Sequence, residues 1–313
     1  MTVCSHSSLE VKEPLPGTAP RGDVWMLLEY DGIWGEQAFK ESKLPKLVKS
    51  HLNDLLDQIP FCKLLLIRQH LARRVSRHGD RLSINHRQLG IRFYLARTTE
   101  HEPLLYDFRL GQYEDLLDLD IQAALSGSGI YTNHISDQVL TLICTNGRRD
   151  WCCARYGPGI YHEMIQAADE SPGPLSIWQS SHLGGHRFAP NIVCFPQGIF
   201  YGRIEKDELV IFLNQIRQGQ MYAPKARGRV SYPAPVQAAE IYLRQRLGSN
   251  EQLDFQLLDA HERQSGEWLV RFKTLDNGQI NSLEIKKEIT PDRVFKSCND
   301  TATSPVVIYK LMR

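Results

Sequence analysis

The sequence predicts an α/β protein made of two similar units in tandem, followed by an α+β extension at the C-terminal end. Three observations predict this class. Short apolar runs alternate with amphipathic segments, the same order of elements occurs twice, and strand patterns dominate the last quarter of the chain. With 313 residues, 42% hydrophobic and 23% charged, the composition is that of a globular protein of about two domains, which excludes a disordered or fibrous chain.

The first unit is expected within residues 1–133. An N-terminal arm rich in proline precedes the apolar run Val24–Tyr30, which predicts a buried strand. The elements expected after it are a helix over Phe39–Ile59, strands over Cys62–Gln69, Gly90–Arg97 and Pro103–Leu110, and a helix over Tyr113–Leu125. Strand, helix, strand, strand pair and helix is the order of a small thioredoxin-like unit.

The second unit is expected within residues 134–225 and repeats this order. Its elements are a strand over Gln138–Cys144, a helix over Ile160–Asp169, a strand over Leu175–Ser181, a hairpin over Asn191–Pro196 and Gly198–Ile204, and a helix over Asp207–Gln218. Two tandem thioredoxin-like domains are therefore predicted, and the repeated order suggests duplication.

The extension is expected over residues 226–313. It should hold a helix over Val236–Leu247 and strands over Phe255–Leu258, Glu267–Thr274, Gln279–Ile289 and Ser304–Met312. No motif in it indicates chemistry.

The charge balance and the N-terminus limit the classes of partner. Basic and acidic residues number 37 and 36, so no overall field is directed at nucleic acid or an anionic membrane. No apolar run approaches the roughly 20 residues of a spanning helix, and no secretory signal opens the chain. Seven scattered cysteines are not typical of a disulfide-stapled secreted domain. We expect a cytoplasmic protein with neither nucleic acid nor membrane as a partner.

Residues that bind metals concentrate in two segments of the second unit, each beginning where a predicted strand ends. The first segment holds Cys144, Cys152 and Cys153, and the second holds His182 and His186. Loops at the carboxyl ends of neighbouring parallel strands meet at one edge of a sheet, so these side chains are expected to converge. The remaining cysteines are interpreted as structural or incidental: Cys4, Cys62, Cys194 and Cys298.

The spacing of these residues bears on the metal. Eight residues separate Cys144 from Cys153, which is wider than the C-x2–4-C knuckle usual for structural zinc. Gly184 and Gly185 between the histidines favour a loop over a helix. The pattern favours an iron–sulfur cluster slightly ahead of zinc and leaves both open.

Three motifs resemble one known family. C-T-N-G-R-R-D-x-x-C, H-x-G-G-H-R-F-A-x-N and F-P-Q-G-x-F-Y-G-R are similar to the sucrase/ferredoxin-like family, a relative of the thioredoxin-like 2Fe–2S ferredoxins. The resemblance runs from about Cys4 to Tyr222. It implies a 2Fe–2S cluster whose ligands are Cys144, Cys153, His182 and His186. Cys152 stays open as a substitute for Cys153.

The implied function is one-electron transfer to an unknown redox partner protein. Neutral imidazoles in place of thiolates favour uptake of an electron, and their second ring nitrogen would couple reduction to a proton. Arg148, Arg149 and Arg187 lie beside the ligands in sequence and are candidates for stabilising the reduced cluster. No carboxylate pair of the kind a glycosidase needs stands out, so an electron-transfer protein is favoured over a catalyst. The alternative is a zinc-binding, non-redox interaction or scaffold protein with the same ligands.

Overall fold

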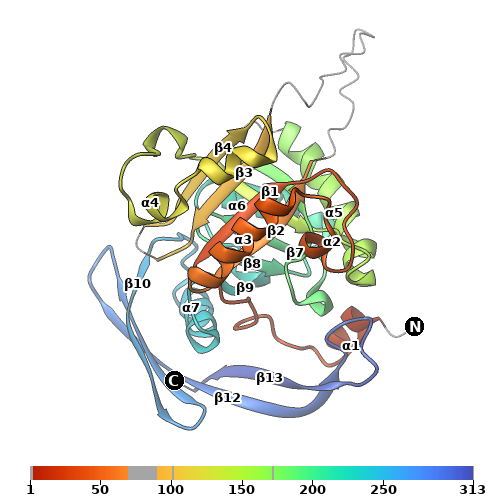
Figure 1. Cartoon of the computed structure of the whole chain (residues 1–313). Helices are drawn as coiled ribbons and strands as arrows, with labels where there is room; N and C mark the ends of the chain where they lie inside the picture. Colours follow the sequence, from red (N-terminus) through yellow and green to blue (C-terminus); the bar gives the residue numbers. More distant parts are fainter. Residues whose placement is uncertain (1–2, 70–89, 101, 171–172, 313) are drawn as a thin grey trace.

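The computed structural model describes residues 3–69, 90–100, 102–170 and 173–312. The fold is mixed α/β, as predicted. Its centre is a nine-stranded sheet in the order β4-β3-β1-β2-β6-β5-β7-β8-β9 (Figure 1). The strands are β1 (Val24–Glu29), β2 (Cys62–Arg68), β3 (Ile91–Arg97), β4 (Leu104–Leu110), β5 (Val139–Cys144), β6 (Leu175–Ser180), β7 (Asn191–Phe195), β8 (Ile199–Gly202) and β9 (Ala226–Arg229).

In the first half of the sheet, β1 and β2 are parallel. Strand β3 is antiparallel beside β1, and β4 is antiparallel beside β3. The helix predicted over Phe39–Ile59 is wrong as one element: α2 (Ala38–Glu41) and α3 (Lys46–Gln58) are separate. Pro45 lies between them, and its missing N–H and fixed φ suit the start of a helix rather than its interior.

The helix predicted over Tyr113–Leu125 is also divided. A 3-10 helix, η2 (Tyr113–Asp118), precedes α4 (Ile121–Ser126). The side chain of Asp120 accepts a hydrogen bond from the amide of Ala123 and so caps the start of α4. An aspartate in this position begins a new helix instead of continuing the old one.

The second half repeats the connectivity of the first. Strands β5 and β6 are parallel. Strand β7 is antiparallel beside β5, and β8 and β9 continue the sheet antiparallel beyond β7. The helix predicted over Ile160–Asp169 starts earlier, because α5 runs over Trp151–Glu170. The carboxylate of Asp150 accepts a hydrogen bond from the amide of Cys152 at 2.9 Å and caps the helix. The helix α6 (Leu209–Arg217) follows β8.

The two halves meet at the carboxyl-terminal tips of β2 and β6. These strands pair antiparallel through Ile67 with Ser180 and Arg68 with Gln179. One hydrophobic core crosses the junction, and it includes Trp25, Leu27, Ile67, Tyr94, Leu142, Trp178, Val193 and Phe195. The sheet and this core thus continue past residue 133, and the predicted division into domains 1–133, 134–225 and 226–313 stays a prediction.

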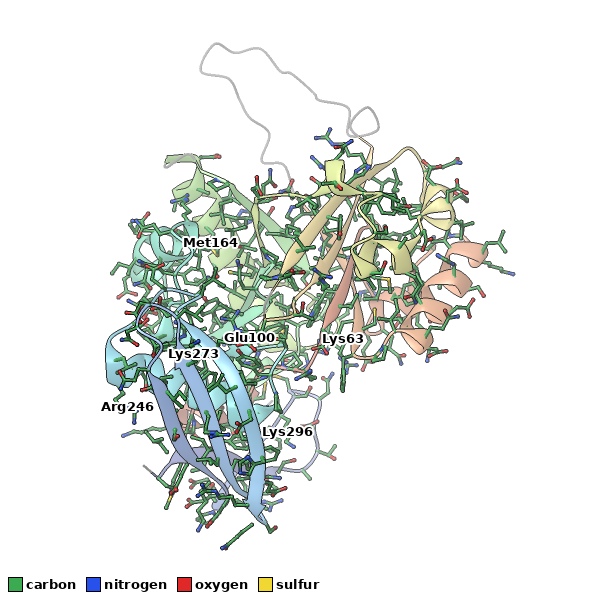
Figure 2. The ribbon with its side chains drawn as sticks, turned by 90° about the vertical axis from the view of Figure 1, so that its left-hand side faces the viewer. Lys63, Glu100, Met164, Arg246, Lys273 and Lys296 are labelled. Carbon is green, nitrogen blue, oxygen red and sulfur yellow. The ribbon has the colours of Figure 1, made fainter. Side chains whose placement is uncertain are left out.

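The C-terminal extension packs α7 (Ala234–Leu247) against a second, antiparallel sheet. Its strands are β10 (Phe255–Gln264), β11 (Glu267–Thr274), β12 (Ile280–Val294) and β13 (Ser304–Leu311), in that order. Figure 2 shows this sheet below the larger one. The long hairpin of β12 and β13 reaches the N-terminal helix α1 (Cys4–Glu10), which the sequence did not predict (Figure 1). No helix in the described part of the chain has the length and apolar character needed to cross a bilayer.

Candidate metal centre

The structure brings the four predicted ligand residues together. Cys144 ends β5, Cys153 lies in the first turn of α5, His182 follows β6, and His186 begins a short 3-10 helix, η4 (His186–Phe188). The Cys153 Sγ atom is 3.3 Å from Nδ1 of His186. The two imidazole rings have their centroids 4.8 Å apart. Because β5 and β6 are parallel neighbours, their end loops meet as expected.

Cys152 faces away from this group. Its Sγ atom lies 3.4 Å from Sγ of Cys4 and 3.3 Å from Sγ of Cys298. The side chains of successive residues in a helix point about 100° apart, so Cys152 and Cys153 cannot be ligands of the same metal site. Of the two adjacent cysteines, Cys153 is the one that faces the histidines.

The protonation states of the two thiols differ. Hydrogen bonding from Cys153 and the neighbouring His182 ring hold the pKa of the buried Cys144 thiol well below its usual range. The pKa of Cys153 is raised, because its thiol proton is shared with Cys144 and its side chain is buried. Burial also lowers the pKa of His186. A thiolate and a neutral imidazole are the forms that bind metals.

One ring nitrogen of His182 is unsatisfied. Nδ1 of His182 is buried and has no hydrogen-bond partner among the described residues. A buried polar atom without a partner is rare in folded proteins and requires an explanation. A metal bound by two thiols and two imidazoles would supply it, and this donor set fits a 2Fe–2S cluster or a zinc ion.

Arg227 of β9 holds the histidine loop. It is fully buried and donates to the carbonyl oxygen of Gly184 at 3.1 Å and to Oδ1 of Asn191 at 2.7 Å. The Asn191 amide in turn donates to the carbonyl oxygen of Gly185 at 2.9 Å. Arg227 could not be predicted from the sequence, because its carbonyl partner at Gly184 is 43 residues away and no local pattern links them.

Gly157 lets α5 approach the end of β5. A Cβ atom at this position would lie 2.1 Å from the carbonyl oxygen of Cys144. No side chain fits in that space. The close contact fixes how near the first turn of α5, with Cys153, lies to Cys144.

Two of the three arginines beside the predicted ligands form ion pairs. Arg187 forms an ion pair with Glu13 at 2.8 Å, and Arg149 forms one with Glu36 at 3.3 Å. Asp150, which the sequence analysis did not single out, lies 4.0 Å from Nδ1 of His186. The buried arginine that contacts the histidine loop is instead Arg227.

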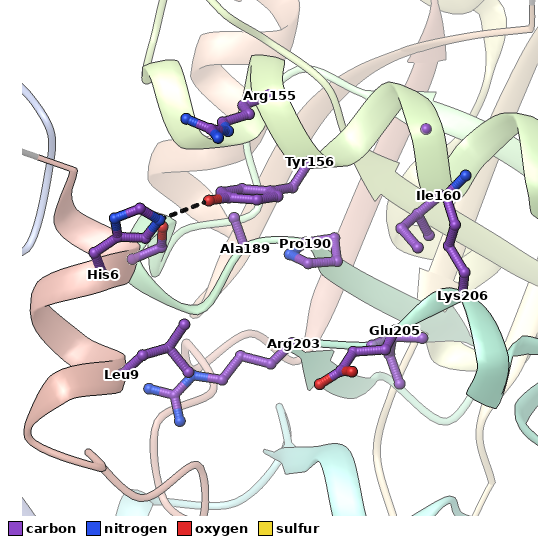
Figure 3. A pocket seen from close by; sticks show the side chains of 13 residues that line it. His6, Leu9, Arg155, Tyr156, Ile160, Ala189, Pro190, Arg203, Glu205 and Lys206 are labelled. Carbon is purple, nitrogen blue, oxygen red and sulfur yellow. Dashed lines mark hydrogen bonds between the residues drawn. The ribbon is translucent and has the colours of Figure 1, made fainter.

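A cavity of about 400 Å³ lies beside α1 and α5 (Figure 3). Its walls are mainly apolar, and a hydrogen bond of 3.2 Å joins the Tyr156 hydroxyl to Nε2 of His6. None of the four predicted ligand residues lines it. The cavity and the metal centre are separate features of the surface.

A sequence model of the sucrase/ferredoxin-like proteins matches residues 15–228, more than half of the chain. The chain belongs to the sucrase/ferredoxin-like family. This confirms the resemblance inferred from the three motifs.

Two curated relatives of this family member carry the name altered inheritance of mitochondria protein 32. The one from Meyerozyma guilliermondii is 28% identical over 162 residues, which are 49% of this chain and 56% of that protein. The one from Debaryomyces hansenii is 31% identical over 91 residues, 25% of this chain and 33% of that protein. The matched part therefore spans about half the length of the first relative and about a third of the second.

Among solved structures, this sucrase/ferredoxin-like chain matches a thioredoxin-like [2Fe-2S] ferredoxin from Aquifex aeolicus. The TM-score is 0.29 at 13% identity, with 31% of this chain and 97% of that chain covered. A second structure, of the wild-type ferredoxin, has a TM-score of 0.24 at 14% identity, with coverages of 27% and 89%.

Proposed function

We propose that this protein is a one-electron carrier that holds a 2Fe–2S cluster through Cys144, Cys153, His182 and His186. The observation that carries the proposal is the convergence of two thiols and two imidazoles at the ends of two parallel strands. The buried, unpartnered Nδ1 of His182 supports it, and so does membership of the sucrase/ferredoxin-like family.

The surroundings suit a carrier more than a catalyst. A 2Fe–2S cluster bound here would take up and release one electron. Cys144 and Cys153 are 1% exposed and His186 is buried, whereas His182 is partly exposed, so the His182 side of the centre faces solvent. An unknown redox partner protein would dock on that side. The ring nitrogens not used for binding can take up a proton, which would make reduction proton-coupled.

Arg227 would adjust the potential of the centre. Its guanidinium is buried and bonded to neutral oxygens of Gly184, Asn191 and Thr18. A positive charge buried near the thiolate of Cys144 offsets negative charge added on reduction. This contribution favours the reduced state.

A zinc-binding scaffold protein with the same ligands is the second candidate. The contact of 3.3 Å between Cys153 Sγ and His186 Nδ1 favours it, because two ligands of one ion approach each other that closely. A tetrahedral Cys2His2 site would then stabilise the loops without redox chemistry.

Metal and acid-labile sulfide analysis of anaerobically purified protein separates the two. The carrier requires about two irons and two sulfides per chain and a coloured protein. Protein voltammetry should then give a reversible one-electron wave. Zinc at the Cys2His2 site with no sulfide, or a cluster without a redox wave, would overturn the carrier proposal.

The compartment belongs to the same proposal. No disulfide joins any of the seven cysteines, as expected in a reducing compartment, and we place the protein in the cytoplasm. Cell fractionation against cytosolic and mitochondrial markers tests this location. Recovery of the chain with the mitochondrial marker would overturn it.

A further inference from the structure

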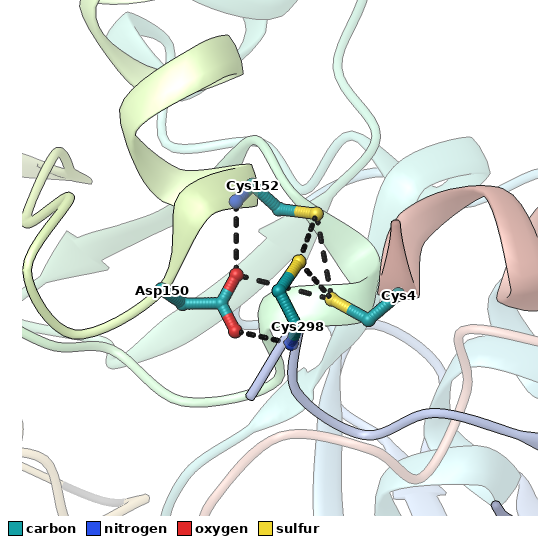
Figure 4. A group of neighbouring side chains, drawn as sticks. All are labelled: Cys4, Asp150, Cys152 and Cys298. Atoms are coloured by element: carbon teal, nitrogen blue, oxygen red, sulfur yellow. Dashed lines mark hydrogen bonds between the residues drawn. The ribbon is translucent and has the colours of Figure 1, made fainter. Parts of the chain in front are cut away.

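A second group of sulfur atoms lies on the other side of the first turn of α5 (Figure 4). Sγ of Cys152 is 3.4 Å from Sγ of Cys4 and 3.3 Å from Sγ of Cys298, and the remaining side of the triangle is 3.5 Å. Oδ1 of Asp150 is 3.9 Å from Sγ of Cys4. The four ligand atoms all lie within 4.8 Å of one another.

These residues come from three distant segments. Cys4 begins α1, Cys152 is in the first turn of α5, and Cys298 lies in the connection between β12 and β13. Cys4 and Cys298 are 294 residues apart in sequence. Cys4 and Cys152 are fully buried. Cys298 is half-buried, so each segment contributes one thiol to a group that is mostly buried.

The geometry fits a tetrahedral metal site. With Zn–S bonds of 2.3 Å, the sulfurs of a tetrahedral zinc site lie roughly 3.8 Å apart, a few tenths of an ångström more than here. A disulfide would use two of the three sulfurs and leave the third buried beside it. A single ion uses all three, and Asp150 provides an oxygen on the fourth side.

The carboxylate of Asp150 is held in place. Its Oδ2 accepts hydrogen bonds from the amide of Cys298 at 2.9 Å and from the hydroxyl of Ser297 at 2.8 Å. The hydroxyl of Ser5 lies 3.3 Å from Sγ of Cys152. Hydrogen bonds of this kind orient the ligands of structural metal sites.

We propose that Cys4, Cys152, Cys298 and Asp150 bind one structural zinc ion, separate from the Cys2His2 centre. The ion would fasten α1 and the β12–β13 hairpin onto the start of α5. It joins both ends of the chain to the helix that carries Cys153. Its role is structural, because three thiolates and a carboxylate leave no open position for a substrate.

Metal analysis of the full chain tests this site. Protein produced with both iron and zinc in the medium should hold about one zinc per chain, whatever its iron content. Cys298→Ser should lower the zinc content at least about fivefold and leave the iron unchanged, because a hydroxyl is a poor replacement for a thiolate. Cys62→Ala, which removes a buried cysteine from β2, is the matched control and should keep both metals.

The two proposals fail separately. His186→Ala should remove iron and leave this zinc, so iron without zinc overturns the present site alone, and zinc without iron overturns the carrier alone. If Cys298→Ser does not fold, zinc-edge X-ray absorption of the wild-type protein replaces it. Three sulfurs near 2.3 Å and one oxygen near about 2.0 Å are expected. A mixed shell of two sulfurs and two nitrogens, or a disulfide among the three cysteines in peptide mapping, overturns the proposal.

Discussion

The two halves of the nine-stranded sheet have the same connectivity and different chemistry. In each half two parallel strands joined by a helical crossover are followed by an antiparallel pair. Strand β5 ends at Cys144 and leads to a helix whose first turn carries Cys153, whereas β1 is followed by Tyr30 and a loop without cysteine. A shared scaffold therefore sets where loops emerge, and the loop residues set what they bind.

The half without the proposed ligands contacts the loops of the half that has them. The side-chain amide of Asn146, in the loop after β5, donates to the carbonyl oxygen of Gly35 at 2.9 Å. The Ser181 hydroxyl accepts a hydrogen bond from the amide of Leu66 at 3.1 Å. Because β2 and β6 meet tip to tip, the loops after β1 and β5 lie side by side. The first half therefore contributes hydrogen bonds to the loops that carry the proposed ligands, and none of the proposed ligands themselves.

Removing one proposed ligand from the second half should have the largest effect. Cys153→Ala in the second half should reduce the iron content from about two per chain to almost none, because a 2Fe–2S cluster needs four ligands. Iron and sulfide analysis measures this. Cys152→Ala, at the neighbouring position that faces away, should keep its iron. Iron loss in Cys152→Ala but not in Cys153→Ala would reverse the assignment.

The second half continues into β9 and α7, where a buried ion network has no counterpart beside β4 among the described residues. Glu240 is 2.9 Å from Arg244 and 3.1 Å from Arg229, and all three are buried. Glu240→Gln should lower the free energy of unfolding by about 3–5 kcal/mol, because two buried guanidinium groups lose their counter-charge. Urea denaturation measures this loss.

The same network predicts a pH dependence. Burial raises the pKa of Glu240, but Arg229 and Arg244 outweigh it and hold the pKa below its usual range. A depressed carboxyl pKa contributes stability above the unfolded-state pKa of about 4.3, and this contribution is lost as the pH falls through the folded-state pKa. The wild type should therefore lose its advantage over Glu240→Gln in acid. A difference that is constant from neutral to acidic pH would contradict this.

Exchanging one proposed histidine ligand for cysteine should change the reduction potential of the second half. His182→Cys adds a thiolate charge that opposes the incoming electron, so the reduction potential should fall by an amount on the order of 100 mV. The wild-type potential should fall by about 59 mV per pH unit where a histidine titrates with reduction. The variant should show that slope over a narrower pH range. Voltammetry across pH measures both, and an unchanged potential would exclude His182 as a ligand.

The smallest expected effect concerns the contact between α5 and β5. Gly157→Ala places a methyl group against the carbonyl oxygen of Cys144 and should cost about 1–3 kcal/mol of unfolding free energy. Gly159→Ala on the same helix is the matched control, since nothing lies within 4 Å of its Cβ position. It should be neutral or stabilising by up to about 1 kcal/mol. Thermal unfolding compares them, and equal effects would show that the close approach does not matter.

Local patterns in the sequence were enough to predict most of the strands. The run Glu267–Thr274 was predicted with the bounds that β11 has, because apolar and polar residues alternate along it. The start of α5 was missed because Gly157, Pro158 and Gly159 are typical of a helix end. The cap at Asp150 is a local signal, since its carboxylate accepts from the amide of Cys152, whereas the packing of Gly157 against Cys144 joins two separate elements that no local pattern links.

Site residues divide in the same way. The spacing at strand ends indicated three cysteines and two histidines, and the resemblance to the family selected Cys144, Cys153, His182 and His186 among them. Cys4 and Cys298 were interpreted as incidental, because their partners are more than a hundred residues away and only the folded chain brings them together. Spacing in a sequence can reveal a site built from two loops, but not one built from three distant segments.

The tip-to-tip junction of β2 and β6 has a consequence for the exposed edges of the sheet. A single four-stranded half would end in a bare β6 edge beside Trp178, an aromatic that packs on Tyr94 of the other half at 5.8 Å. Bare edges and exposed aromatics pair with copies of themselves. Two identical halves joined at such an edge would form a two-fold symmetric dimer. Within one chain the two edges cover each other instead, because β2 and β6 pair through Ile67 with Ser180 and Arg68 with Gln179.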